Sequence, residues 1–337
     1  MAQESNSGDF AAQVEAFGAD YNRIAESIAT VIVGHQQVVH DVLTCLLCGG
    51  HALLEGVPGL GKTLLVRTLG QALEMSFSRI QFTPDLMPAD ITGTNVVVEA
   101  PGGGKAFQFH PGPIFANLVL ADEINRATPK TQSAVLEAMQ EKTVSISRTT
   151  HALPRPFLVM ATQNPLEMEG TYPLPEAQLD RFMLKIRVES PSAKELAAII
   201  ARTTGEETAP APRAADAAGI IAMQQLVRQV PVATHVNGYV ARLVLATDPR
   251  NDAASPDTKK YIRYGASPRG AQSIVMASKV LALRDGRANV ALDDIKSVAV
   301  AALRHRIILS FEGQADGIDT DDLIAKVVAS VPSAAQE

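Results

Sequence analysis

The stretch Gly56-Val57-Pro58-Gly59-Leu60-Gly61-Lys62-Thr63 decides the fold of this chain. It fits the pattern G-x-x-x-x-G-K-[ST], follows an apolar run at residues 51–54 and precedes an amphipathic run at residues 64–69. A strand that leads through a glycine-rich turn into a helix points backbone N–H groups at a polyphosphate, with the positive end of the helix dipole behind them. The context therefore favours a nucleotide site over a glycine-rich turn that matches by accident.

Each residue type in this stretch suits phosphate chemistry. The glycines let the backbone approach phosphate oxygens, and Lys62 supplies a mobile positive charge for the β- and γ-phosphates. Thr63 would place its hydroxyl on Mg²⁺. The expected nucleotide contacts are Gly56, Val57, Pro58, Gly59, Leu60, Gly61, Lys62, Thr63 and Leu64.

Length and composition describe a globular protein of two domains. At 337 residues the chain is too long for one small domain, and 46% hydrophobic with 20% charged residues is ordinary for a folded protein. The net charge of −6 offers no basic excess to a phosphate backbone, so nucleic acid is not an expected partner. No apolar segment reaches the roughly 18 residues of a membrane span, and the polar N-terminus lacks the form of a signal peptide. We therefore expect no membrane span and a cytoplasmic location.

A second apolar run, at residues 117–121, leads directly into Asp122 and Glu123. A strand that is buried on both faces carries acids only at its carboxyl end, where ligands bind in open parallel sheets. Asp122 can hold Mg²⁺, and Glu123 can orient or deprotonate a water molecule. Without the phosphate-binding stretch upstream, the pair would be interpreted as solvated loop acids.

A third apolar run, at residues 157–161, is followed by Thr162-Gln163-Asn164-Pro165. Asn164 stands at the carboxyl end of the expected strand, where its amide can hydrogen-bond a water molecule or a γ-phosphate oxygen. An Asn before Pro is also an ordinary turn residue. The residue pattern alone leaves both interpretations open.

Five apolar runs with intervening helical patterns predict a doubly wound parallel sheet with helices on both faces. The runs lie at residues 51–54, 78–82, 117–121, 157–161 and 182–186. The composition changes at residues 189–191, and the patterns that follow are helical. We expect a disordered N-terminus at 1–15, a nucleotide-binding α/β domain at 16–190, an all-helical domain at 191–327 and a flexible tail at 328–337.

Two further pairs of β-prone runs predict hairpins. The first pair lies at residues 95–99 and 105–109 around a proline and three glycines, and the second lies at residues 144–147 and 151–153.

An apolar corner at residues 31–35 precedes a helix that contains Cys45 and Cys48. Val33 and Gly34 in this corner can cradle a nucleobase or simply pack in the core, and their spacing does not distinguish the two. The cysteines, with histidines on either side, would form a metal-ligand or redox set. The surrounding valines and leucines instead favour a buried helix whose small positions are cysteines.

The runs GVPGLGKT, NLVLADEINRA, ATQNP, GTYPLPEAQLDRF and GASPRG together resemble the MoxR family of AAA+ ATPases, in the group with insertions in helix 2 and before sensor 1. The resemblance covers roughly residues 25–310. It implies an AAA+ domain with a five-stranded parallel sheet, a helical lid domain, ATP and Mg²⁺ as cofactors, and assembly into a homo-oligomer, a hexameric ring.

The resemblance also implies a role for each motif residue. Lys62 and Thr63 match Walker A, Asp122 and Glu123 match Walker B, Asn164 matches sensor 1, Arg181 matches an arginine finger that reaches a neighbouring subunit, and Arg269 matches sensor 2. Val33 and Gly34 match the nucleobase pocket, with His35 where relatives usually have Gln. The two insertions correspond to about 84–113 and 143–154 and would project from the ring face toward a client or partner.

In function, the resemblance implies chaperone-like remodelling, maturation or metal insertion in a client protein complex, often with a von Willebrand factor A domain partner. A nucleotide-switched scaffold with little turnover is one alternative, which Glu123 and Arg181 disfavour. A nucleic-acid translocase is another, which the acidic net charge disfavours.

Two groups of basic residues have simpler interpretations. Arg304-His305-Arg306 ends a helical pattern, where positive charge is favourable, and we prefer this interpretation to a role at an interface. Lys259, Lys260 and Arg263 are interpreted as a solvated face.

Overall fold

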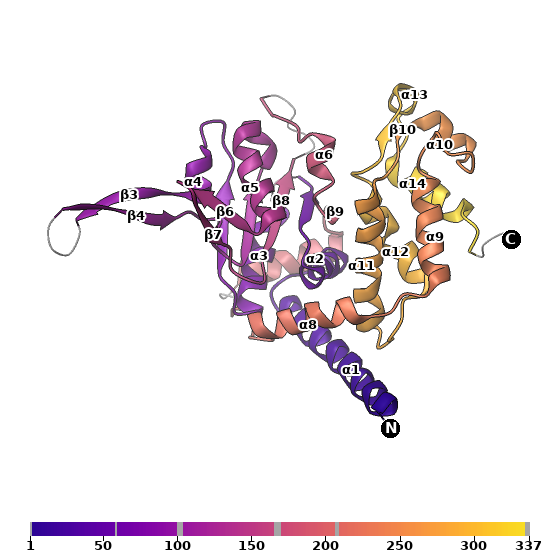
Figure 1. Ribbon diagram of the computed structural model, residues 1–337, viewed down its shortest axis with the longest axis horizontal. Helices are drawn as coiled ribbons and strands as arrows, with labels where there is room; N and C mark the ends of the chain where they lie inside the picture. Colours follow the sequence, from indigo (N-terminus) through magenta and orange to yellow (C-terminus); the bar gives the residue numbers. More distant parts are fainter. Residues whose placement is uncertain (1, 58, 100–103, 165–169, 206–208, 334–337) are drawn as a thin grey trace.

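The computed structural model describes residues 2–57, 59–99, 104–164, 170–205 and 209–333 (Figure 1). The first part of the chain forms α1 (Ala2–Ala29), α2 (Gln36–Cys48), β1 (Ala52–Glu55), α3 (Lys62–Ala72), β2 (Phe77–Gln81), α4 (Pro88–Thr92), β3 (Gly93–Glu99), β4 (Lys105–Pro111), β5 (Leu118–Asp122), a 3₁₀ turn at Ile124–Arg126, α5 (Pro129–Glu141), β6 (Thr143–Ile146), β7 (Thr149–Ala152), β8 (Leu158–Gln163), α6 (Glu176–Leu179) and β9 (Leu184–Arg187). The second part forms α7 (Ala193–Thr203), α8 (Ala217–Gln229), α9 (Thr234–Leu245), α10 (Pro256–Tyr261), β10 (Ile262–Tyr264), α11 (Pro268–Arg284), α12 (Leu292–Leu303), β11 (Ile308–Leu309), α13 (Phe311–Ala315) and α14 (Thr320–Ser330).

The central sheet has five parallel strands in the order β2-β5-β8-β1-β9, which confirms the predicted fold class. Its central strands consist of apolar residues because helices cover both faces of the sheet. Successive side chains of a strand point to opposite faces, and accordingly Leu53 and Leu54 belong to the two different cores on either side of the sheet. In register, Gln81 pairs with Asp122, and Leu54 pairs with Thr162. The carboxyl ends of β1, β5, β8 and β2 therefore meet at one edge.

The C-terminal domain packs beside the sheet at the β9 edge (Figure 1). α11 contacts α2, and α12 contacts β9, so the two domains share one apolar core. Within the described residues, no helix is both long and apolar enough to cross a membrane.

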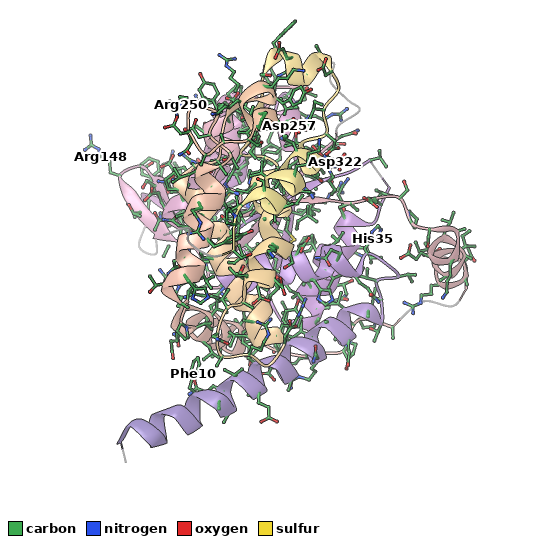
Figure 2. All side chains as sticks on the ribbon, turned by 90° about the vertical axis from the view of Figure 1, so that its right-hand side faces the viewer. Phe10, His35, Arg148, Arg250, Asp257 and Asp322 are labelled. Carbon is green, nitrogen blue, oxygen red and sulfur yellow. The ribbon has the colours of Figure 1, made fainter. Side chains whose placement is uncertain are left out.

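Both predicted hairpins are present. β3 pairs with β4 and β6 with β7, each antiparallel, and the β3–β4 hairpin projects far from the body (Figure 1). The Phe109 ring of β4 stacks on the His151 imidazole of β7 with 4.0 Å between centroids, and Phe115 meets the edge of Phe109. The aromatic stack ties the two hairpins together at their bases, while Arg148, at the turn of the second hairpin, points away from the body (Figure 2).

The structure differs from the expected organisation at the N-terminus, in the lid and at the C-terminal tail. Residues 1–15 were expected to be disordered, yet α1 begins at Ala2 and continues into a half that is anchored by the buried residues Phe17 and Tyr21. The lid is not wholly helical, since Ile262–Tyr264 pairs with Ile308–Leu309. α14 extends to Ser330, inside the expected tail.

The cysteine helix is a core element, as the packing interpretation predicted. Cys45 and Cys48 are buried free thiols on α2. The nearby His51 is held between strands and helices: its Nε2 donates to the Met139 carbonyl (3.1 Å), and its Nδ1 accepts from the Val159 N–H (3.0 Å). Burial lowers the pKa of His51 to about 4, so the ring is neutral and structural.

Candidate nucleotide site

The glycine-rich loop forms the turn that the sequence predicted. Gly59 and Gly61 have φ angles of 87° and 75°, in the left-handed region that favours glycine, and Gly61 caps the N-terminus of α3. The Lys62 ammonium donates hydrogen bonds to the carbonyls of Gly56 (2.7 Å) and Val57 (3.0 Å), so it lies over the loop. Pro58 lies outside the described residues.

The two acids at the end of β5 are ordered by Thr162 of β8. The Thr162 hydroxyl donates to Asp122 Oδ1 (2.7 Å), and the hydroxyl oxygen of Thr162 accepts a hydrogen bond from the Glu123 N–H (2.8 Å). Glu123 has a φ of 56°, in the left-handed region that is uncommon for a residue with a side chain. The turn directs the Glu123 side chain into the space beside the loop.

A cavity of about 390 Å³ brings half of the predicted site residues together at the carboxyl edge of the sheet. Its lining includes the predicted residues Gly59, Leu60, Gly61, Lys62, Thr63, Asp122, Glu123 and Asn164. Asn164 is buried at the end of β8, which places it beside the acids rather than in a solvated turn. The carboxyl ends of three adjacent strands thus supply the loop, the acids and the amide.

Two cavity residues from β2, Arg79 and Gln81, were missed by the sequence analysis. Arg79 donates to Asp122 Oδ2 through Nη2 (2.6 Å) and Nε (3.1 Å), and Gln81 Nε2 donates to Glu123 Oε2 (2.8 Å). Arg126 Nη1 also contacts Glu123 Oε2, at 3.2 Å. Arg79 and Gln81 are two positions apart on a strand and therefore share one face, which is the only signal that the sequence offered.

The oxygen donors in this cavity fit a hard divalent cation. The Thr63 hydroxyl and the Asp122 carboxylate line the same space. The described residues contain no cluster of three or more His, Cys, Asp and Glu side chains that would enclose an ion. This set suits a cation that takes most of its ligands from phosphate and water oxygens. Burial lowers the pKa of Lys62, while Asp122 and Glu123 act in the opposite direction.

The Arg79 contact predicts competition between a guanidinium and a cation at Asp122. In Arg79→Gln, we expect Mn²⁺ to bind about two- to fivefold more tightly, because a half-exposed ion pair contributes up to about 1 kcal/mol. Titration of Mn²⁺ followed by electron paramagnetic resonance measures this. Arg213→Gln, which breaks an exposed pair with Glu74, is the matched control. Unchanged or weaker Mn²⁺ binding in Arg79→Gln would show that the pair does not compete with metal.

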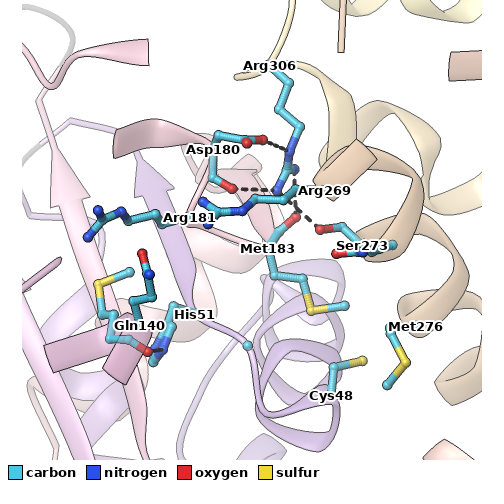
Figure 3. Close-up of a pocket in the computed structure, with 13 residues that line it drawn as sticks. Cys48, His51, Gln140, Asp180, Arg181, Met183, Arg269, Ser273, Met276 and Arg306 are labelled. Atoms are coloured by element: carbon cyan, nitrogen blue, oxygen red, sulfur yellow. Dashed lines mark hydrogen bonds and ion pairs between the residues drawn. The ribbon is translucent and has the colours of Figure 1, made fainter. Parts of the chain in front are cut away.

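Arg181 and Arg269 lie outside the phosphate cavity. Among the described residues, neither lines the phosphate cavity; both line a second cavity, of about 240 Å³, between the end of α6 and the start of α11 (Figure 3). Arg181 Nη1 donates to the Leu136 carbonyl of α5 at 2.7 Å. The two arginines therefore belong to one site, separate from the Lys62 of their own chain.

Five more predicted contacts are also outside the described lining of the phosphate cavity: Val33, Gly34, Gly56, Val57 and Leu64. Leu64 is 43% exposed on α3. Val33 is half-buried, and a Cβ at Gly34 would meet the Glu195 side chain of α7. The corner at residues 31–35 thus lies against α7, and its residues Val31 and Ile32 pack on the main core.

The helix-end interpretation of Arg304 and Arg306 was incomplete. Arg306 is buried and pairs with Asp180 at 2.8 Å, and Arg304 donates to the Lys185 carbonyl and pairs with Asp321. Both cations join the lid to the sheet domain, which the sequence pattern of a helix end does not reveal.

The chain matches two family models and several relatives. The model described as "ATPase family associated with various cellular activities (AAA)" matches residues 51–184, and the "AAA lid domain" model matches residues 255–327. Chaperone MoxR1 of Mycobacterium tuberculosis is 44% identical over 304 residues, which are 90% of this chain and 80% of that protein. Protein MoxR of Paracoccus denitrificans is 32% identical over 83% of this chain and 86% of that protein.

A solved structure agrees with these matches. The crystal structure of a protein from Cytophaga hutchinsonii has a TM-score of 0.90 and 37% identity, and the match covers 98% of this chain and 99% of that one. The overall arrangement of the chain is thus shared with that solved structure. The chain is an ATPase, and it belongs to the MoxR family of AAA+ ATPases.

Proposed function

We propose that this ATPase works as a ring of identical copies, hexameric as the family resemblance implies, in which each complete hydrolytic site spans two copies. The phosphate cavity comes from one copy, and Arg181 and Arg269 come from the next. The observation that carries this proposal is that both arginines line one cavity and neither lines the phosphate cavity of its own chain. An arginine that reaches a γ-phosphate from a neighbour contributes about 10³–10⁵ in rate.

Within one copy, the cavity residues that the sequence predicted divide the chemistry among them. The loop N–H groups and Lys62 bind the ATP phosphates, and Thr63 and Asp122 would hold Mg²⁺, which neutralises charge on the β- and γ-phosphates. Glu123 accepts the proton of the attacking water, and Asn164 orients that water or a γ-phosphate oxygen. The short contacts of Thr162 with Asp122 and Glu123 support this division because they fix both acids relative to the loop.

Hydrolysis drives chaperone-like remodelling or maturation of a client protein complex, including metal insertion. The similarity to a protein named Chaperone MoxR1 supports this class of function, and the family resemblance adds a von Willebrand factor A domain partner. The β3–β4 hairpin is suited to touch a client. Val97 and Phe107 face each other across it and are 55% and 79% exposed, which is unusual for an apolar pair on a projecting element.

The dependence of turnover on protein concentration tests the shared site. We expect the ATPase rate per copy to fall when dilution dissociates the assemblies, as followed by mass photometry, and to recover on reconcentration. Binding of a fluorescent ATP analogue at the same concentrations is the control, because the phosphate cavity of one copy is sufficient for binding. Dilute single copies that hydrolyse ATP at the full rate would refute the proposal.

A further inference from the structure

The chain segment that carries Arg181 is held by a buried guanidinium from the lid (Figure 3). The Arg306 side chain is 2% exposed, and its Nε donates to Asp180 Oδ1 at 2.8 Å. Its Nη2 donates to the carbonyls of Phe182 (2.6 Å) and Asp180 (3.2 Å), and its Nη1 donates to the carbonyl of Met183 (3.1 Å). The acceptors lie immediately before and after Arg181, so one guanidinium fixes the backbone on both sides of it.

The Asp180 carboxylate also reaches the segment that carries Arg269. The Ser267 hydroxyl lies 2.8 Å and 2.9 Å from the two Asp180 carboxylate oxygens, to which it donates. Ser267 is the N-cap of α11, and its Oγ accepts from the Arg269 N–H at 3.1 Å. A single carboxylate therefore adjoins Arg181 along the chain and contacts the cap that sets the start of the Arg269 helix.

Stability alone does not account for this arrangement. Burial of a guanidinium lowers the pKa of Arg306, and the Asp180 carboxylate opposes that shift. Replacing a buried ion pair by apolar residues of similar volume is often neutral or stabilising, so such a pair is weak evidence for a stabilising role. The planar fork of Arg306 instead matches several fixed acceptors at once, which is how a guanidinium defines geometry.

We propose that Asp180, Ser267 and Arg306, the Asp180 network, position Arg181 and Arg269 as one unit for the nucleotide held by the neighbouring copy. The inference depends on the proposed function, since it assumes that Arg181 acts on a neighbour. None of the three network residues touches ATP, and each acts through the arginines. Because two of them belong to the lid and one to the sheet domain, a shift of the lid against the sheet must either break these hydrogen bonds or move both arginines.

The test uses Asp180→Asn and Ser267→Ala in the full chain. We expect kcat for ATP hydrolysis to fall roughly 10- to 100-fold in Asp180→Asn, since a misplacement of about 1 Å can cost 10²-fold, and less in Ser267→Ala. Binding of a fluorescent ATP analogue stays unchanged, because each variant keeps its own phosphate cavity. Ser310→Ala is the matched control: Ser310 caps α13 of the same lid, and its hydroxyl donates to the Lys260 carbonyl, outside the Asp180 network.

Mixing experiments separate positioning from general damage. An Asp180→Asn copy has an intact phosphate cavity, and a Glu123→Gln copy has intact arginines, so the mixture should hydrolyse ATP faster than the sum of the two separate rates. If the mixture shows no such gain, or if both network variants keep the wild-type kcat, the inference is wrong. Arg181→Ala is measured in parallel: full activity in that variant would refute the shared site itself, independently of the network.

Discussion

Replacing Glu123 with glutamine is expected to lower the ATPase rate by about 10²–10⁴-fold, the usual contribution of a positioned general base, while ATP still binds. The reason is that glutamine keeps the shape of the side chain but cannot accept the proton of the attacking water. Glu123 is the acid best placed for this task, since its backbone N–H is fixed by Thr162 and its carboxylate lines the phosphate cavity. Steady-state phosphate release and binding of a fluorescent ATP analogue measure the two effects.

The control for this substitution is Glu15→Gln, at an exposed position of α1 remote from the phosphate-binding loop in sequence. It should keep the wild-type rate. If Glu123→Gln also hydrolyses ATP at close to that rate, Glu123 does not activate water, and another group in the cavity must do so.

Replacing Arg181 with alanine is expected to lower the rate by about 10³–10⁵-fold at protein concentrations where the wild type is assembled. ATP binding should persist, because Arg181 is absent from the described lining of the phosphate cavity of its own chain. Equimolar mixing with the inactive Glu123→Gln copy should restore turnover, since some interfaces then combine an intact cavity with an intact arginine.

Arg250→Ala provides the matched control for Arg181→Ala. Arg250 lies on the lid with its side chain 82% exposed, and its guanidinium pairs with Asp248, two residues before it (Figure 2). This variant should behave as wild type. An Arg181→Ala protein that assembles and hydrolyses ATP normally would leave the second cavity without a role in turnover.

The sheet and the phosphate cavity were predictable because their signals are local in the sequence. A buried strand requires a continuous apolar run, and the residue that ends it lies at the edge where ligands bind, so Asp122 and Glu123 could be placed from the chain alone, while the residue pattern left Asn164 open between a site residue and a turn residue. The glycines of the loop are equally local, since a positive φ at positions 59 and 61 restricts the choice of residue.

The features that the sequence did not predict depend on contacts between segments that are distant in the chain. Arg79 and Gln81 look like ordinary polar positions of a short strand, and only the pairing of β2 with β5 brings them to the acids. Arg306 resembles a favourable charge at a helix end until the lid is packed on the sheet. β10 and β11 are three and two residues long, which is too short for any period to appear in the sequence.

The separation of the phosphate-binding loop from Arg181 and Arg269 of the same chain affects how many complete hydrolytic sites a given number of copies can form. If the proposed site is shared between copies, an open row leaves the copy at one end with ATP and no arginine from a neighbour, and the copy at the other end with its Arg181 and Arg269 facing solvent. Joining the two ends brings the unused arginines to the incomplete site. Closure of the ring therefore adds one complete hydrolytic site without adding a subunit.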